Sequence, residues 1–353
     1  RAWCTRLTEG LYSAYMMAGS SLVGYQDMSA QSEAYFQAMD FRFLFDSQRQ
    51  VFHLGYNVEA EELDSNHYDL LASEARLASL LAIAKGDVPQ SHWLHLARPL
   101  CRIDGTRALL SWNGSMFEYL MPPLLVRSYE GTLLHQTCRA AIARQIAYAR
   151  QRDVPWGISE AGYYGFDTNM NYQYRGFGVP GLGFKRGLGE DLVISPYASL
   201  LALSLHPQAV MQNIARLTEQ QMLGPYGFYE ALDYTRSRLP LGQKSRIVRS
   251  HMVHHQGMIL LALTNYLQDE AMIRRFHADP RVQSTDLLLH EHVPRQVPVE
   301  RLYPEEIGII RPVQPRLTIE PWRAPVDGPL PQVHFLSNGR YGLLITSAGG
   351  GYS

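Results

Sequence analysis

The sequence is poor in cysteine and has no long apolar run. Its three cysteines, Cys4, Cys101 and Cys138, are too few and too widely spaced for a disulfide framework or a Cys-x-x-Cys metal site. We therefore expect reduced thiols, as in a cytoplasmic protein. Without an apolar run of about 18 residues, the sequence predicts no membrane span. The chain also has neither a basic-then-apolar leader nor an initiator methionine, so we expect a piece of a longer polypeptide.

A strong charge of either sign is also missing. Lys and Arg total 32 against 33 for Asp and Glu, which leaves a formal net charge of -1. This balance argues against nucleic acid as a partner and against membrane contact through a polybasic patch. The 353 residues are 46% hydrophobic, as in a soluble globular protein with one large core or two smaller ones. Tyrosine is abundant, and its apolar face and polar hydroxyl suit a saccharide site.

Helical periodicity dominates the first 292 residues. Apolar residues recur at helical spacing, and several segments end in a basic last turn or a glycine. The predicted helices span residues 9–23, 29–38, 70–84, 132–150, 196–205, 206–222, 251–267, 269–277 and 284–292. Short aromatic and glycine-rich loops separate them. This order predicts an all-α fold of the (α/α)6-barrel type, a toroid of helix pairs around a central cleft.

Small β elements and a change of composition complete the pattern. Residues 42–56 alternate around a polar turn and predict a β-hairpin. Nine prolines between Pro294 and Pro331 exclude helices, so residues 296–331 are expected to form an extended linker. Residues 332–353 predict a hairpin around Asn338-Gly339. A lone hairpin is barely stable. We therefore expect a catalytic domain over 1–295, the linker, and the first strands of a truncated β-domain.

Two glutamates are the first candidates for catalysis, because glycosidic-bond cleavage needs two carboxyl groups. Glu160 lies in the apolar, aromatic segment VPWGISEAGYYGFD, where a carboxyl group tends to keep its proton as a general acid must. Glu74 lies in LDSNHYDLLASEARLASL, within the predicted helix 70–84, with Asp69 nearby. Spacing alone leaves a structural salt bridge open for Glu74 and a helix-start role open for Glu160.

Other polar motifs are less specific. Glu230 in GPYGFYEALDY and Glu118 in SWNGSMFEYLMP are further carboxylates with sugar-binding or structural roles. His254 and His255 are adjacent on a helix, point about 100° apart and lack an HExxH motif, so we expect no metal. No GxxxxGK[ST], Rossmann glycine motif or GxSxG elbow occurs. The sequence therefore predicts no cofactor.

Several long strings resemble one family. They are LDSNHYDLLASEARLASLLAIAKGDVP, LLSWNGSMFEYLMPPLL, VPWGISEAGYYGFDTNMNYQYRGFGVPGLG, EDLVISPYASLLAL, YGFYEALDYT and HHQGM. Together they resemble the central, glucoamylase-like domain of the cyclic β-1,2-glucan synthases, over about residues 38–297. The tail HFLSNGRYGLLITSAGGGYS resembles the start of the phosphorylase-type domain that follows in that family. The first 37 residues match less distinctly.

The resemblance implies a retaining transglycosylase with an (α/α)6 barrel. An internal glucosyl unit of linear β-1,2-glucan would pass to a glutamate and then to the chain's own 2-hydroxyl, closing a ring. Matching motifs give Glu160 as acid/base and Glu74 as nucleophile. The implied partners are the glucosyltransferase and phosphorylase-type modules of one large enzyme. The implied location is the cytoplasmic face of the inner membrane.

Ring closure requires an acceptor hydroxyl to outcompete water, so it must be held at high effective concentration. Aromatic and acidic side chains are the candidate sugar-binding residues, although each aromatic could equally pack in the core. They are Asp69, Trp112, Trp156, Tyr163, Tyr172, Tyr174 and Glu230. Two alternatives stay open: an endo-β-1,2-glucanase that uses water as acceptor, and a non-catalytic glucan-binding module.

Overall fold

The computed structural model describes residues 1–103, 105–294, 299–300, 330–337 and 341–352. The chain divides into two units, Arg1–Ile310 and Arg311–Ser353. No helix of the described residues is both long enough and apolar enough to cross a membrane. Cys4, Cys101 and Cys138 are free thiols, and Cys101 and Cys138 are buried.

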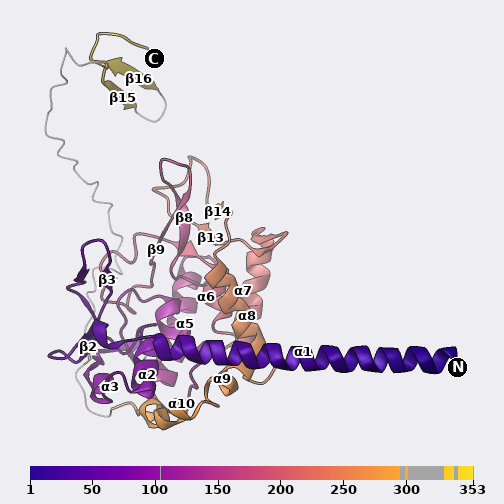
Figure 1. Ribbon diagram of the computed structural model, residues 1–353. Coiled ribbons are helices and arrows are strands. Elements are labelled where there is room, and N and C mark those ends of the chain that lie inside the picture. Colours follow the sequence, from indigo (N-terminus) through magenta and orange to yellow (C-terminus); the bar gives the residue numbers. More distant parts are fainter. Residues whose placement is uncertain (104, 295–298, 301–329, 338–340, 353) are drawn as a thin grey trace. The chain divides into compact units, whose positions relative to one another are not determined.

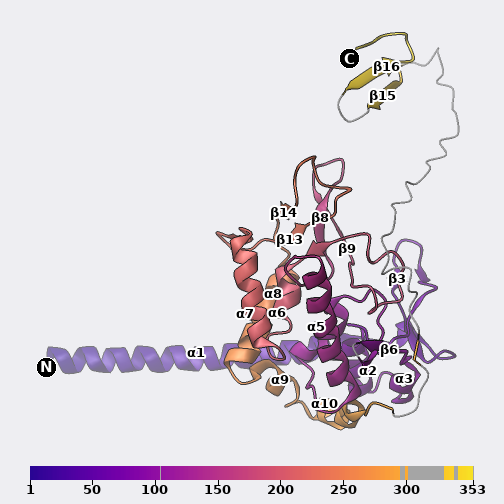
Figure 2. The same ribbon diagram turned by 180° about the vertical axis from the view of Figure 1, so that it is seen from behind.

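Helices are the principal regular structure of the first unit, with small sheets between them, so the all-α prediction holds only in part (Figures 1 and 2). Its α-helices are α1 (Ala2–Ala38), α2 (Arg76–Lys85), α3 (Ser91–His95), α4 (Met116–Leu120), α5 (Leu133–Gln151), α6 (Pro196–Leu200), α7 (Pro207–Glu219), α8 (Val253–Leu267), α9 (Ala271–Phe276) and α10 (Pro280–Ser284). Short 3₁₀ turns follow at Arg42–Leu44, Pro122–Leu124 and Asp286–His290. In the part of this unit that the structure describes, a closed ring of helix pairs is not seen.

Small antiparallel sheets lie between the helices. Strands β1 (Phe45–Asp46), β2 (Val51–His53) and β5 (His67–Tyr68) form one sheet, and β10 (Val193–Ile194), β13 (Ala231–Asp233) and β14 (Arg246–Val248) form another. Two-stranded pairs are β3 (Tyr56–Asn57) with β4 (Glu62–Leu63), β6 (Leu100–Ile103) with β7 (Thr106–Leu109), β8 (Ala161–Phe166) with β9 (Tyr172–Arg175), and β11 (Leu223–Gly224) with β12 (Gly227–Phe228). Strand β13 also contacts β8, the strand that begins directly after Glu160.

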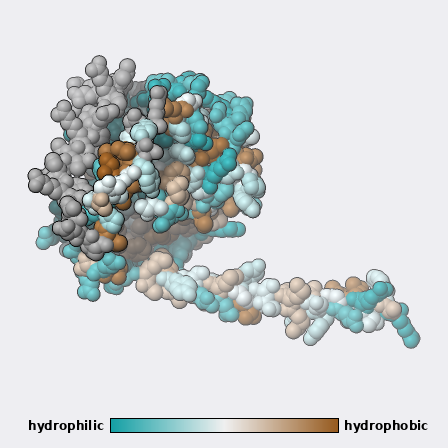
Figure 3. All heavy atoms as spheres, turned by 90° about the horizontal axis from the view of Figure 1, so that it is seen from above, coloured by the Kyte–Doolittle hydropathy of each residue, from teal (hydrophilic) through white to brown (hydrophobic). Residues whose placement is uncertain are grey.

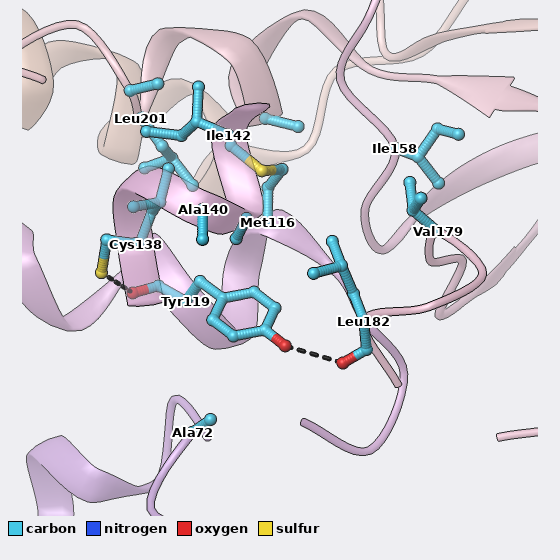
Figure 4. Close-up of a cluster of buried hydrophobic side chains, with 14 of the residues drawn as sticks. Ala72, Met116, Tyr119, Cys138, Ala140, Ile142, Ile158, Val179, Leu182 and Leu201 are labelled. Atoms are coloured by element: carbon cyan, nitrogen blue, oxygen red, sulfur yellow. Dashed lines mark hydrogen bonds between the residues drawn. The ribbon is translucent and has the colours of Figure 1, made fainter. Parts of the chain in front are cut away.

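One large apolar cluster holds the first unit together. Helix α5 contributes buried residues to it on one side and contacts both α4 and strand β7. Tyr119 of α4 is buried within the cluster, and its hydroxyl donates to the carbonyl oxygen of Leu182 at 2.7 Å (Figure 4). Cys138 of α5 donates through its thiol to the carbonyl of Tyr119. Burial of these side chains removes apolar area from water, which is the main force that stabilises the unit.

Most of the predicted helices are confirmed, with shorter ends. Helix α5 matches the prediction for 132–150, and α7, α8 and α9 match those for 206–222, 251–267 and 269–277. The prediction for 196–205 holds only for its first five residues, and that for 284–292 corresponds to a 3₁₀ turn. The predicted hairpin over 42–56 is confirmed by the pairing of β1 with β2.

Three predicted helices have other bounds in the structure. Residues 9–23 and 29–38 lie in one continuous helix, α1, because a single glycine weakens a helix without ending it and no proline lies in this stretch. The helix predicted over 70–84 begins only at Arg76. Residues 69–71 pair with the chain near Ala97 instead: Leu71 N donates to Ala97 O at 3.0 Å, and Ala97 N to Asp69 O at 2.6 Å. This pairing holds the backbone extended and delays the helix.

Helix α1 has no buried residue. Its hydrogen bonds and ring contacts with the rest of the unit lie near its C-terminal end, where Arg281 pairs with Glu33 and Lys85 bonds to the carbonyl oxygens of Gln37 and Met39. Apolar side chains are spread over its exposed surface (Figure 3).

The second unit contains a small antiparallel sheet. Strand β15 (Val333–Ser337) pairs with β16 (Gly342–Thr346), which confirms the predicted hairpin strands, and β16 also pairs with β17 (Gly351–Tyr352). The predicted turn at Asn338-Gly339 lies outside the described residues. So does the predicted linker 296–331, except for residues 299–300 and 330–331.

Candidate active site

Glu160 lies at the junction between a buried segment and strand β8. Residues 154–159 are buried, Glu160 is half-buried, and β8 starts at Ala161. The hydroxyl of Tyr197 lies 2.9 Å from the Glu160 carbonyl oxygen and 2.8 Å from Ser159 Oγ. Ser159 Oγ also accepts a hydrogen bond from Phe117 N at 3.0 Å. The backbone is therefore fixed at Glu160, while the residue as a whole is only half-buried.

The surroundings of Glu160 favour its protonated form. Burial, followed by the negative charges of Glu74 and Glu118, raises the pKa of the Glu160 carboxyl to about 7, against a lowering effect of Lys185. A carboxyl group with this pKa is protonated in a large fraction of molecules near neutral pH. It can therefore donate a proton to a leaving oxygen, as a general acid must.

Glu74 affects the ionisation of Glu160 although 86 positions (160 minus 74) separate them in the sequence. Its charge is among the causes of the raised pKa of Glu160, so the two carboxyl groups are near enough for their charges to interact. Contrary to the sequence prediction, Glu74 lies in the turn that precedes α2 rather than inside a helix. Ser73 Oγ donates to Glu74 Oε2 at 3.2 Å. The two glutamates that the sequence singled out are therefore electrostatically coupled.

Tyr68 links strand β5 to this pair. Its hydroxyl hydrogen-bonds to Glu74, and its pKa is raised by burial and then by the charges of Glu74 and Glu160. Because an ionised carboxylate only accepts hydrogen bonds, the Tyr68 hydroxyl is the donor. Sequence reasoning missed this residue, although it falls within the string NHYDLLASEAR.

Arg76 anchors the turn that carries Glu74. The guanidinium is buried and does not pair with Glu74. It donates to the carbonyl oxygens of Ser73 at 2.8 Å, Glu118 at 2.7 Å and Tyr119 at 2.7 Å. These three bonds tie the Glu74 turn to helix α4.

Glu118 is a third carboxylate near the site, and its hydrogen bonds indicate a structural role. It is 3% exposed, and it closes a capping box with Ser115 at the start of α4. Oε1 accepts from the backbone N of Trp112 and Asn113, and Oε2 from Ser111 Oγ and from both N and Oγ of Ser115. All of these acceptor positions serve to hold the loop 111–115, so Glu118 positions that loop.

Glu230 is also buried, at 2% exposure, and both of its carboxylate oxygens accept hydrogen bonds. Oε1 accepts from Gly162 N and Oε2 from His255 Nδ1, each at 3.0 Å. The His255 ring stacks on Tyr197 with centroids 3.7 Å apart, and its Nε2 lies 3.3 Å from the Tyr174 hydroxyl. Burial, Glu160 and Glu230 raise the pKa of Tyr174, which places its hydroxyl within the field of Glu160. A chain of contacts therefore runs from Glu230 through His255 to Tyr174.

The remaining predicted sugar contacts have different surroundings. Trp112 is 60% exposed, whereas Trp156 is 6% exposed and bonded through its backbone to Asn213, as a core residue is. Tyr163 and Tyr172 are half-buried on the β8–β9 hairpin, and Asp69 is exposed. Trp156 and Glu230 are therefore interior residues, while the others keep some exposed surface.

Comparisons with known proteins agree on one family. Residues 66–280 match the model of a protein family described as "Putative glucoamylase". The chain is 46% identical over 323 residues to the cyclic β-(1,2)-glucan synthase NdvB of Rhizobium meliloti (strain 1021). The aligned region covers 90% of this chain and 11% of that protein. The resemblance expected from the motifs is thereby confirmed, and the chain spans about a ninth of this relative's length.

Solved structures show a similar fold. An endo-β-1,2-glucanase from Chitinophaga pinensis, in complex with sophorotriose and glucose, superposes with a TM-score of 0.54 at 15% identity, over 75% of this chain and 65% of that chain. A structure described as a putative glucoamylase from Bacteroides caccae gives a TM-score of 0.53 at 16% identity, over 75% and 65%. These similarities support a glucoamylase-like arrangement of helices with small sheets.

Proposed function

We propose that this chain, which belongs to the family described as "Putative glucoamylase", is a retaining transglycosylase that converts linear β-1,2-glucan into cyclic β-1,2-glucan. The observation that supports this most directly is the pairing of Glu160, whose pKa is raised to about 7, with Glu74. Two carboxyl groups in different environments can take the roles of acid and nucleophile. The substrate follows from the relative that acts as cyclic β-(1,2)-glucan synthase.

In the first step of this mechanism, Glu74 attacks the anomeric carbon of an internal glucosyl unit. The bond from that carbon to the glycosidic oxygen breaks, and Glu160 gives its proton to the leaving oxygen. Tyr68 donates a hydrogen bond to Glu74, which orients the attacking carboxylate. The products are a glycosyl-enzyme ester at Glu74 and a released segment of glucan.

In the second step, the 2-hydroxyl at the non-reducing end of the bound chain attacks the same carbon. Glu160, now ionised, accepts the hydroxyl proton, and the Glu74 carboxylate leaves. The ring closes, and both glutamates return to their starting protonation states. Water gives a linear product instead, so the acceptor segment must be held against the glycosyl-enzyme. Trp112, Tyr163, Tyr172 and Tyr174 are our candidates for holding it.

A hydrolase is the second candidate, since the fold resembles that of an endo-β-1,2-glucanase. Mass spectrometry of products from linear β-1,2-glucan separates the two functions. Rings lack a reducing end and are lighter by one water than linear chains of equal length. Short linear products alone would favour hydrolysis, and no product at all would favour a glucan-binding module.

The assignment of roles has its own test. With an activated β-glucoside, azide should rescue Glu74→Ala to give a glycosyl azide of inverted configuration. It should rescue Glu160→Ala to give one of retained configuration. An exchange of these outcomes would reverse the roles of the two glutamates.

We further propose that the helices of residues 1–295 belong to an (α/α)6 toroid, that residues 296–331 form a linker, and that 332–353 open a following β-domain. The chain matches only 11% of the length of its relative, which supports the proposal that it is a module of a larger enzyme. Its partners would be glucosyltransferase and phosphorylase-type modules at the cytoplasmic face of the inner membrane.

A further inference from the structure

A second cluster of reactive side chains lies outside the proposed active site, on the sheet β1–β2–β5. His53 of β2 is directly opposite His67 of β5, with ring centroids 4.3 Å apart. Asp46 of β1 lies beside them. A ligand atom from each of the three residues lies within 4.8 Å of those from the other two. None of the three takes part in the glycosyl transfer proposed above.

The hydrogen bond of His53 fixes its protonation pattern. Nδ1 lies 2.7 Å from the carbonyl oxygen of Asp64. A carbonyl oxygen can only accept, so Nδ1 holds the proton, and in the neutral ring Nε2 keeps a free lone pair. Histidines that bind metals commonly donate their second nitrogen to a carbonyl or carboxylate in this way.

Asp46 and His67 are also held in place. Asp46 Oδ1 accepts hydrogen bonds from Gln48 N at 2.9 Å and Arg49 N at 3.0 Å, which leaves Oδ2 directed at His67 Nε2, 3.1 Å away. The His67 side chain is 8% exposed and that of Asp46 is 20% exposed. Arg49 Nε lies 3.9 Å from Oδ2, but its side chain is 68% exposed and free to turn toward solvent.

We propose that Asp46, His53 and His67 bind one Zn²⁺, or a chemically similar first-row divalent ion, with water in the remaining position. Two imidazole nitrogens and one carboxylate oxygen are a ligand set that suits such ions. The ion would take the place of the proton between His67 Nε2 and Asp46 Oδ2, and His67 would then hold its ring proton on Nδ1.

The ion would join three strands and support the active site indirectly. Successive residues of a strand point to opposite faces, so Tyr68 leaves β5 on the face away from His67. Tyr68 is the residue that hydrogen-bonds to Glu74. A metal that fixes β5 would therefore also fix the position of the Tyr68 hydroxyl. We expect it to raise the melting temperature of the protein.

Zinc titration of the full chain, stripped of metal by a chelator, tests this proposal. A chromophoric competitor reports stoichiometry and affinity for wild type and for His53→Gln, His67→Gln and Asp46→Asn. In the last variant, the amide oxygen can still accept the backbone bonds of residues 48 and 49. His95→Gln is the matched control, because His95 is an exposed histidine of α3 bonded only locally, to Ser91 O at 2.8 Å.

We expect one Zn²⁺ per wild-type chain, unchanged in His95→Gln, and binding at least about 100-fold weaker in each cluster variant. Circular dichroism verifies that the variants are folded. Should a variant fail to fold, the visible absorption of Co²⁺ added to wild type provides a separate readout. A wild-type chain without a one-equivalent Co²⁺ band, or zinc binding that survives in folded His53→Gln and His67→Gln, would overturn the proposal.

Discussion

His255 donates from Nδ1 to Glu230 Oε2 over 3.0 Å, and the two side chains are 2% and 1% exposed. This pair stands behind the proposed active site, because His255 Nε2 meets the Tyr174 hydroxyl at 3.3 Å. The carboxylate fixes the tautomer of His255, so in the neutral ring Nε2 accepts the proton of Tyr174. The Tyr174 oxygen is thereby left as an acceptor toward the region of Glu160.

Glu230→Gln should lower kcat without unfolding the protein. The amide can still accept from Gly162 N, but its nitrogen would donate to His255 Nδ1 and move the ring proton to Nε2. Tyr174 would then lose His255 as an acceptor and keep only His254 Nε2, which also lies 3.3 Å from its hydroxyl. We expect a coupling energy of about 1–2 kcal/mol between Glu230→Gln and Tyr174→Phe in a double-mutant cycle. Strictly additive losses would contradict this relay.

Glu160→Gln should abolish most glycosyl transfer. Removal of a general acid costs about 100- to 10,000-fold in rate. In wild type, the pKa of about 7 predicts that activity falls as pH rises through this value, because the acid loses its proton. The dependence of kcat/KM on pH for linear β-1,2-glucan checks this. A profile that stays flat from pH 6 to 9 would exclude Glu160 as the acid.

The same carboxyl group should affect stability in a pH-dependent way. Its folded pKa of about 7 lies above the ordinary value of 4.5, so the folded state favours the protonated form. The resulting stability is complete below about pH 4.5 and is lost as pH rises through about 7. Relative to wild type, Glu160→Gln should therefore gain about 2 kcal/mol in free energy of unfolding between pH 5 and pH 8, with an allowance for partial exposure. Urea denaturation at both values measures the difference, and no change with pH would show that the pKa is unperturbed.

Tyr68→Phe should reduce catalysis while preserving the sheet. It removes one hydrogen bond to a charged carboxylate, worth about 1.5–3 kcal/mol, so kcat/KM should fall about 10- to 100-fold. Tyr25→Phe is the matched control, since Tyr25 is 67% exposed on α1. Equal activity of the two variants would remove Tyr68 from the proposed site.

The sequence singled out Glu160 and Glu74 of the candidate site but not the residues that support them. Glu160 could be found because its neighbours Trp156 and Ile158 are apolar, and local apolar sequence predicts desolvation. Trp156 was a candidate sugar-binding residue but is buried. The sequence shows that a side chain is aromatic, but not whether it faces the core or a ligand. Tyr68 was not assigned a role, and for His255 the sequence argued only against metal binding, since the partners of both residues lie in distant segments.

The helices show the same difference between features that local sequence predicts and features that depend on distant contacts. The bounds of the long helix α5 are predicted almost to the residue, because the spacing of its apolar residues directly reflects the face that the helix buries. The start of α2 is predicted wrongly, because a backbone pairing with Ala97 competes with helix formation at residues 69–71. Such competition depends on contacts in space and leaves no local signal.

Gly178 provides a final prediction about the loop beside the site. A Cβ atom built at Gly178 would lie 1.6 Å from the carbonyl oxygen of Asn113, which is backbone and cannot turn away. Gly178→Ala should therefore displace the loop 111–115, whose position Glu118 fixes through its bonds to Trp112 and Asn113. We expect a loss of about 3 kcal/mol in unfolding free energy, together with reduced activity. Gly257→Ala is the control: nothing lies within 4 Å of its Cβ and it is in helix α8, so it should gain about 0.5–1 kcal/mol. If both substitutions were equally mild in thermal unfolding, the close packing of Gly178 on Asn113 would be incorrect.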